Sequence, residues 1–310
     1  MIVFGGVLIL KRIAALIAAL LICSSALACA ASVPAAAAET APVFTPTPEP
    51  VHETPVPKET SAPTPDAEKG ITFLDGGEIE LSDAFRASIP AFTGKLAGKP
   101  TVLIYHTHAR EAFLNTSKLQ NKNGKPAYRS MEPEDTVIHL GDILTEELKQ
   151  RGFDVLHDPF DAEEPALDYA YDTMRAHFDE VYAERTFDLY IDLHRNAASV
   201  SSMQDDVVMP KGERTARLFF VVGTGISPVS IQQKGTDNWK TNYALAQALT
   251  DAFAPVSDRI CKPIRVKQKV YNQDLGLSIL AEIGHNANTM EDAERTVPYL
   301  ADVIAEVLLP

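Results

Sequence analysis

The chain has 310 residues, of which 45% are hydrophobic and 23% charged, a composition that supports a folded core and excludes wholesale disorder. Its 28 Lys and Arg against 42 Asp and Glu give a formal charge of −14, which argues against nucleic acid as a partner. Two of the three cysteines, Cys23 and Cys29, lie in an apolar N-terminal run, and only Cys261 lies in the body of the chain. This excludes a disulfide framework and a cysteine-based zinc site.

Residues 1–31 have the features of an export element. A Lys-Arg pair at 11–12 precedes an apolar, uncharged run of 19 residues over 13–31. Small residues ending at Ala30 are typical of a cleaved signal peptide, whereas the length of the run also suits a membrane span. We favour a single N-terminal anchor in the cell membrane with the rest of the chain outside the cell. Cleavage near Ala30 would instead make the protein a secreted one.

Residues 32–70 form a linker rich in Pro, Ala and Thr. Nine of the 21 prolines fall between Pro34 and Pro65, and large apolar residues are scarce there. Such a segment cannot bury enough apolar surface to offset the entropy lost on ordering. We therefore predict a disordered, extended spacer that holds a folded domain away from a membrane.

The rest of the chain alternates predicted strands with predicted helices. Residues 71–100 are expected to form a short N-terminal extension, a strand and a turn, that packs on a domain at 101–310. Continuous apolar strands that alternate with helices predict an α/β fold, an open and mainly parallel sheet flanked by helices. The strands are expected at 101–106, 153–156, 187–193, 218–222, 264–270 and 278–283, and the helices at 135–151, 166–182, 238–253 and 289–309.

Four residues suited to metal and proton chemistry occur at the ends of these strands, where open α/β sheets place their functional sites. His108 and Glu111 follow the first strand of the domain, His194 follows the third, and Glu282 lies in the last. A catalytic zinc takes three His or carboxylate ligands and keeps one position for water. A further carboxylate must accept the proton of that water. His108, Glu111 and His194 fit the ligand role, and Glu282 fits the base.

Neighbouring residues are candidates for supporting roles. His106 precedes His108 by two positions, so in an extended strand it faces the same way, either as an alternative ligand or as an outer hydrogen-bond donor. Arg110 and Arg195 flank the proposed metal and could meet the carboxylates of a substrate, although Arg195 could equally belong to a structural ion pair. A lone histidine at a strand end is more often structural than a ligand, so the hypothesis depends on all four residues coming together.

The motifs that contain these residues resemble a known family. The segments are VLIYHTHAREAF (102–113), LYIDLHRNA (189–197), YNQDL (271–275) and AEIGHNANTMEDA (281–293). Together they resemble the stage II sporulation protein P family, peptidoglycan hydrolases related to zinc N-acetylmuramoyl-L-alanine amidases, over roughly residues 100–307. The resemblance implies a zinc-dependent enzyme of sporulation and engulfment that cleaves the bond between muramic acid and the L-alanine of the stem peptide.

Carried over residue by residue, the resemblance implies Zn²⁺ at His108 and His194 and a catalytic role for Glu282. Two residues compete for the third ligand position. The HxxE arrangement of zinc carboxypeptidases is similar to His108 and Glu111, whereas the wider amidases bind zinc through a Glu at the start of the first helix, near Glu134 here. We favour Glu111.

Two further positions bear on the resemblance. Glu282, Gly284 and Asn288 resemble the Glu-x-Gly-x-x-x-Asn signature of the amidases, and the resemblance makes Asn288 a candidate for binding substrate or supporting the metal ligands. Asn196 stands where the family commonly has Asp, which removes a charge near the proposed metal.

Other functions stay open at this stage. One alternative is a zinc endopeptidase that cuts peptidoglycan cross-links, and another is a tethered, non-catalytic cell-wall-binding protein. The resemblance further implies sporulation partners, namely a glycan-cleaving wall hydrolase and a membrane scaffold.

Overall fold

The structure is a computed structural model that describes residues 70–114, 128–197, 206–228, 238–257 and 259–310. The predicted anchor and nearly all of the predicted linker lie outside these residues. Within them, the helices are too short or too polar to cross a membrane. The described residues belong to one compact unit.

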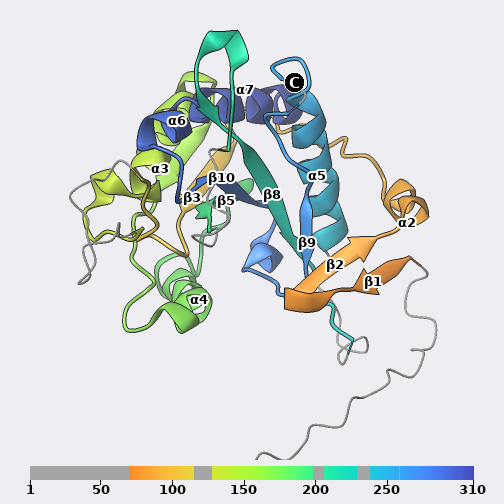
Figure 1. Cartoon of the computed structure of the whole chain (residues 1–310). Helices are drawn as coiled ribbons and strands as arrows, with labels where there is room; N and C mark the ends of the chain where they lie inside the picture. Colours follow the sequence, from red (N-terminus) through yellow and green to blue (C-terminus); the bar gives the residue numbers. More distant parts are fainter. Residues whose placement is uncertain (1–69, 115–127, 198–205, 229–237, 258) are drawn as a thin grey trace, which may run out of the picture. The chain divides into compact units, whose positions relative to one another are not determined.

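One sheet of eight strands organises this unit, in the order β1-β2-β9-β8-β10-β5-β3-β4 (Figure 1). Strands β4, β3, β5 and β10 are parallel to one another, β8 runs antiparallel to β10, and β9 is parallel to β8. The predicted open, mainly parallel sheet is confirmed, and its antiparallel pairs lie on the β8 side. The strands are β1 (Ile71–Phe73), β2 (Glu78–Leu81), β3 (Thr101–Tyr105), β4 (Asp154–His157), β5 (Leu189–Asn196), β8 (Leu218–Gly223), β9 (Arg265–Lys267) and β10 (Ser278–His285).

The segment before β3 extends the sheet. Strands β1 and β2 pair as an antiparallel hairpin, and β2 pairs with β9. The short helix α2 (Asp83–Ser88) follows, and the side chain of its N-cap residue Ser82 accepts a hydrogen bond from the Phe85 amide. A separate two-stranded sheet, β6 (Val207–Val208) and β7 (Thr215–Ala216), precedes β8.

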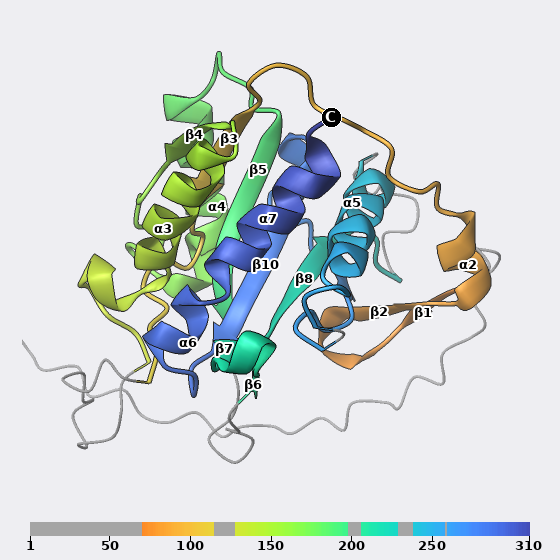
Figure 2. The same ribbon diagram turned by 90° about the horizontal axis from the view of Figure 1, so that it is seen from above.

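Helices cover both faces of the sheet. Helices α3 (Val137–Gln150), α5 (Trp239–Ala252) and α7 (Val297–Leu308) lie side by side over one face, as Figure 2 shows, and α4 (Ala170–Val181) packs on the other. The strand period of two sends alternate residues to these faces, so that Ile191 and Leu193 join the first core and Tyr190 joins the core under α4.

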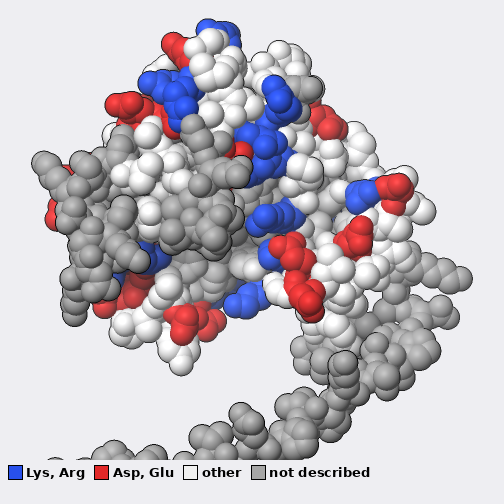
Figure 3. All heavy atoms as spheres, viewed as in Figure 1, with Lys and Arg blue, Asp and Glu red and all other residues white. Residues whose placement is uncertain are grey.

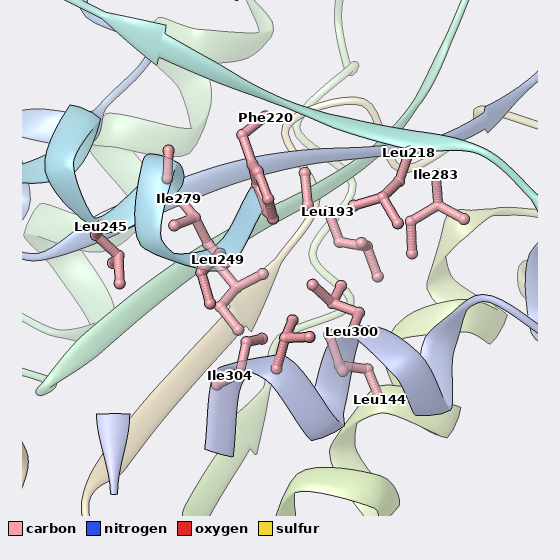
Figure 4. Packing of buried hydrophobic residues seen from close by; sticks show 14 of the residues in the cluster. Leu144, Leu193, Leu218, Phe220, Leu245, Leu249, Ile279, Ile283, Leu300 and Ile304 are labelled. Atoms are coloured by element: carbon pink, nitrogen blue, oxygen red, sulfur yellow. The ribbon is translucent and has the colours of Figure 1, made fainter. Parts of the chain in front are cut away.

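The larger core fills the space between the sheet and the three helices (Figure 4). On α3, Leu140, Leu144 and Leu148 recur every four residues and are fully buried, which is the apolar stripe that its sequence predicts. Phe220 on β8 and Leu300 on α7 are likewise fully buried and point into the same space. This packing holds the strands whose ends carry the candidate site.

The predicted closing helix at 289–309 is wrong as a single element. The chain forms α6 (Met290–Glu294), interrupts the helix, and continues as α7. Pro298 in the first turn of α7 has no backbone N–H to donate to a preceding turn. The hydroxyl of Thr296 donates to the Ala216 carbonyl at 2.7 Å, which fixes the interruption against β7.

A small third cluster lies on the same face of the sheet as α4, but over strands β8 and β10. It consists of Phe219 and Val221 on β8 and Leu280 on β10, with Tyr271 packed against them. Among the described residues, no helical residue belongs to this cluster. These side chains form the floor of the cavity described next.

Candidate active site

The carboxyl ends of three adjacent parallel strands bring the predicted site residues together. Glu282 on β10 is the register partner of His194 on β5, and His108 lies in the turn that follows β3. The rings of His108 and His194 have centroids 5.4 Å apart. With Glu111 these residues line a cavity of about 400 Å³. The four residues that the sequence selected therefore share one site.

Glu111 lies beside the histidines, and Glu134 does not. The Oε2 atom of Glu111 accepts a hydrogen bond from the Arg195 amide at 2.9 Å and lies 3.5 Å from Nδ1 of His194. Glu134 is exposed in a 3₁₀ turn at Pro133–Asp135 and is not among the residues that line the cavity. Burial alone raises the pKa of the Glu111 carboxyl, but contact with His194 and the charge of Arg195 outweigh burial and hold that pKa below its usual value.

His194 is held between two carboxylates. Its Nδ1 faces Glu111, and its Nε2 lies 2.7 Å from Oδ1 of Asp192. Asp192 is fully buried and accepts hydrogen bonds from the amide and the hydroxyl of Thr107 at 2.9 and 2.7 Å. Burial lowers the pKa of His194, but the charges of Asp192 and Glu111 outweigh burial and raise it well above the usual value. A carboxylate behind a histidine is the arrangement that orients metal ligands.

Three buried polar atoms of cavity-lining residues have no hydrogen-bond partner among the described residues: Nδ1 of His108, Nε2 of His194 and Oε2 of Glu282. Of these atoms, Nε2 of His194 nevertheless lies 2.7 Å from Oδ1 of Asp192. Buried polar atoms are normally paired, and this set of His and carboxylate donors is the one that zinc prefers. The donor set therefore fits a zinc ion with a water molecule.

The side chains are not arranged as a finished metal site. Within the described part of the chain, no three His, Cys, Asp or Glu side chains converge closely enough to hold a metal ion. Metal binding by this set needs side-chain adjustment.

Glu282 has the properties of a general base. Its register partners are His194 on β5 and Phe219 on β8, and Glu282 itself is half-buried at the cavity. Burial and the negative charge of Glu111 raise the pKa of its carboxyl to about 7. A carboxyl group that titrates near neutrality can both accept and return a proton.

The raised pKa of Glu282 predicts a pH-dependent stability for the metal-free protein. The pKa is 4.5 without the folded environment and about 7 within it, so in this window the folded state binds more protons than the unfolded chain. Glu282 alone should therefore make the free energy of unfolding fall as pH rises from 4.5 to about 7, whereas His106, His108 and His157, whose pKa values burial lowers, contribute a rise in an overlapping range. Urea unfolding of chelator-treated protein measures this slope. Glu282→Gln cannot titrate, so the slope of its unfolding free energy against pH should be more positive than that of the wild type between 4.5 and 7, and equal slopes would contradict the assignment.

His106 does not share the cavity with His108, contrary to the sequence expectation. Strand β3 ends at Tyr105, and the turn that follows redirects His108, so the period of two does not extend across it. The His106 ring is fully buried against α3. Its Nδ1 donates to the Leu193 carbonyl at 2.8 Å, and its Nε2 lies 2.8 Å from Nε2 of His157.

This histidine pair requires a glycine on α3. A Cβ atom at Gly141 would lie 2.5 Å from Nε2 of His157 and 2.6 Å from Nε2 of His106. His157 also contacts the Asp142 carboxylate, at 2.9 Å from its Nδ1. The pair thus connects α3 to the Leu193 carbonyl, one residue before His194, and supports the site from behind.

The two arginines differ in their surroundings. Arg110 pairs with Asp161 and Glu164 and is not among the cavity-lining residues, so it does not meet a substrate there. Arg195 lines the cavity, but its buried guanidinium donates to the Ala112 carbonyl at 2.8 Å and to the Tyr128 carbonyl at 2.5 Å. These hydrogen bonds favour a structural role for Arg195 over a role in binding substrate.

The signature residues after Glu282 build a turn. Asn288 is fully buried outside the cavity, and its Oδ1 accepts a hydrogen bond from the His285 amide at 2.9 Å. Gly284 has φ +63°, and a Cβ atom there would lie 3.0 Å from that oxygen. Asn196 lines the cavity and pairs in register with His285. Asn288 thus supports the end of β10 and does not contact a ligand in the cavity.

Gly284→Ala should destabilise the protein by about 1–3 kcal/mol, because alanine at this positive φ is strained and its Cβ would press on Asn288. Chemical denaturation measures the change. Gly98→Ala is a matched control, since Gly98 also has a positive φ, +73°, but has open space around its Cβ position. An equal loss of unfolding free energy in the two variants would show that the contact with Asn288 does not add to the destabilisation.

Two tyrosines complete the site. The Tyr171 ring on α4 packs edge-on against His108, with centroids 5.5 Å apart, and against Tyr271 at 5.1 Å. Burial and the charges of Asp192 and Glu282 raise the pKa of Tyr171 well above its usual value. The sequence analysis did not select Tyr171, because nothing in a predicted helix shows which of its side chains points toward a functional site.

Basic residues line the opposite end of the cavity, and sequence reasoning missed these as well. They are Arg265 and Lys267 on β9 and Lys269 just beyond it. Basic residues occur at every second position on either side of the buried Val266. This alternation could have predicted a strand with one charged face.

Comparisons with known proteins give three results. The family model for stage II sporulation protein P (SpoIIP) matches residues 47–305. No curated protein sequence matches. Similar solved structures include the CwlD amidase from Clostridioides difficile in complex with the GerS lipoprotein, at 15% identity and TM-score 0.41 over 67% of this chain and 95% of that chain.

Two further structures are similar at comparable levels. The N-acetylmuramyl-L-alanine amidase Ami1 from Mycobacterium abscessus is 9% identical, with TM-score 0.35, over 68% of this chain and 97% of that one. A metallo-carboxypeptidase from Burkholderia cenocepacia is 12% identical, with TM-score 0.39, over 70% of this chain and 59% of that one. Because the family model spans most of the sequence, the chain belongs to the stage II sporulation protein P family.

Proposed function

We propose that this chain is a zinc-dependent peptidoglycan hydrolase, an N-acetylmuramoyl-L-alanine amidase that cleaves the bond between muramic acid and the stem peptide. The observation that carries the proposal is the meeting of His108, Glu111, His194 and Glu282 in one cavity. The buried atoms of His108 and Glu282 that have no hydrogen-bond partner among the described residues support it. Membership of the sporulation family supports peptidoglycan as the substrate.

The proposed zinc ligands are His108, Glu111 and His194. When bound, zinc lowers the pKa of a coordinated water and polarises the carbonyl of the scissile amide. Asp192 positions the His194 ring through its contact with Nε2, and Thr107 holds Asp192 with two hydrogen bonds. This support fixes the orientation of a ligand before substrate arrives.

Glu282 would accept a proton from the attacking water and deliver it to the nitrogen of the departing stem peptide. Its raised pKa suits both halves of the transfer. The backbone amide of Arg195 fixes the Glu111 carboxylate on the other side of His194.

Mass spectrometry of digested, purified peptidoglycan tests the reaction. An amidase releases stem peptides that begin with L-alanine and leaves glycan strands without peptides. A zinc endopeptidase, the alternative activity, would shorten cross-links and leave peptides attached to the glycan. A well-folded, zinc-loaded protein that produces neither change would overturn both enzymatic proposals and favour a non-catalytic wall-binding role.

The location and partners of the protein are further proposals. The apolar run at 13–31 and the linker at 32–70 support a membrane-tethered domain outside the cell. By family resemblance, its partners would be a glycan-cleaving wall hydrolase and a membrane scaffold of sporulation. Fractionation of cells, with the size of the mature chain, distinguishes an anchored from a secreted protein.

A further inference from the structure

The cavity has a basic end that the proposed reaction does not use. Arg265, Lys267 and Lys269, here named the basic wall, line it together with the catalytic residues. Lys and Arg side chains follow one another down the middle of the face in Figure 3, over the region of β8 and β9 in Figure 1. A basic run is notable on a chain with a formal charge of −14.

The basic wall lies at a defined distance from the candidate catalytic residues. Strands β5, β10, β8 and β9 are consecutive in the sheet. Glu282 is the register partner of both His194 and Phe219, and Val221 is the partner of Arg265. With neighbouring strands about 4.8 Å apart, β9 lies roughly 14 Å from β5. The cavity thus runs across the strands from a catalytic end to a basic end.

The floor between the two ends is apolar. Phe219, Val221 and Leu280 form it, with Tyr271 against them. The guanidinium carbon of Arg265 lies 4.8 Å from the centroid of the Phe219 ring, so the floor also supports the first residue of the basic wall. A ligand that spans the cavity therefore meets apolar surface first and positive charge at its far end.

Two of the three charges of the basic wall are free to bind a ligand. Lys267 pairs with Glu78. Arg265 and Lys269 are both exposed, and in the described ranges no carboxylate lies within ion-pair distance of either. Arginine and lysine in this state favour an anionic ligand, and an arginine can bind a carboxylate through two hydrogen bonds.

We propose that the basic wall binds carboxylates of an acidic peptide whose scissile amide lies at Glu282, so that it sets the specificity of the enzyme for charged stem peptides. Glu282 lies on β10, two strand spacings or roughly 10 Å from β9, and an extended peptide that advances about 3.3–3.6 Å per residue spans this in about three residues. The apolar floor suits small side chains between the cleaved bond and the bound carboxylate. The placement of the scissile amide at Glu282 rests on the proposed function. The binding of carboxylates by the basic wall is independent of that function.

The test measures binding separately from cleavage. The full-length protein with Glu282→Gln is titrated with a fluorescent stem tetrapeptide isolated from peptidoglycan, and with the same peptide after its carboxylates are converted to amides. The carboxylate form should bind about tenfold more tightly than the amide form. Adding Arg265→Glu and Lys269→Glu should abolish this difference. Adding Lys95→Glu and Lys211→Glu, the same charge change outside the cavity, should preserve it.

The outcomes separate this inference from the proposed function. Equal binding of the two peptides, or a preference that persists after the change at Arg265 and Lys269, overturns the role of the basic wall. A variant that binds the peptide normally but loses affinity for phosphate-rich wall polymers overturns it in favour of a polymer ligand. Absence of hydrolysis by the wild type overturns the amidase and leaves the binding result intact. Circular dichroism verifies that each variant folds.

Discussion

Glu282→Gln is expected to lower the rate of peptidoglycan hydrolysis by about 10²–10⁴ and to leave zinc binding unchanged. The amide has the size of the carboxylate but cannot accept the proton of the attacking water. It also cannot return a proton to the leaving amine. Release of stem peptides from purified peptidoglycan measures the rate, and metal analysis of the same sample measures bound zinc.

A matched variant separates this effect from a general loss of structure. Glu184→Gln makes the same chemical change at an exposed position outside the cavity and should keep wild-type activity. Full activity in Glu282→Gln would exclude Glu282 as the base. Loss of zinc together with loss of activity would instead place Glu282 among the metal ligands.

Glu111→Gln is expected to weaken zinc binding by about 100-fold or more, whereas Glu134→Gln should leave it unchanged. Glutamine keeps an oxygen that can accept the hydrogen bond from the Arg195 amide, so the local fold should persist. It removes the negative charge that a zinc site with two histidines requires. Competition with a chelator of known affinity measures the change.

The pair of variants also decides between the two alternatives for the third ligand. Retention of zinc in Glu111→Gln with its loss in Glu134→Gln would reverse the assignment. Such a result would require the 3₁₀ turn at Pro133–Asp135 to move, since Glu134 is exposed in the structure.

The candidate site could be predicted from sequence because its residues lie near or just beyond the carboxyl ends of strands. The strands around Ile104, Ile191 and Ile279 are continuous apolar runs, and such runs indicate buried parallel strands whose carboxyl ends meet. This placed His108, His194 and Glu282 together without knowledge of strand order. Their roles as ligands and base remain predictions that the variants above test.

Sequence periodicity failed where the backbone turns. The period of two predicted that His106 and His108 face the same way, but β3 ends at Tyr105. The helical period predicted one closing helix, but Pro298 and the hydrogen bond from Thr296 to β7 divide it. A periodic pattern is a local property, and it holds only as far as the backbone keeps its regular dihedral angles.

By itself, the sequence determined the alternation of strands and helices, the apolar stripes that form the core, and the identity of the residues at the strand ends. These depend on interactions between near neighbours along the chain. Only the tertiary structure decided that Glu111 and not Glu134 lies beside His194, that Arg195 serves the fold, and that β9 carries a basic wall into the same cavity. Those outcomes depend on the order β9-β8-β10-β5-β3, which joins segments distant in sequence through packing and backbone hydrogen bonds.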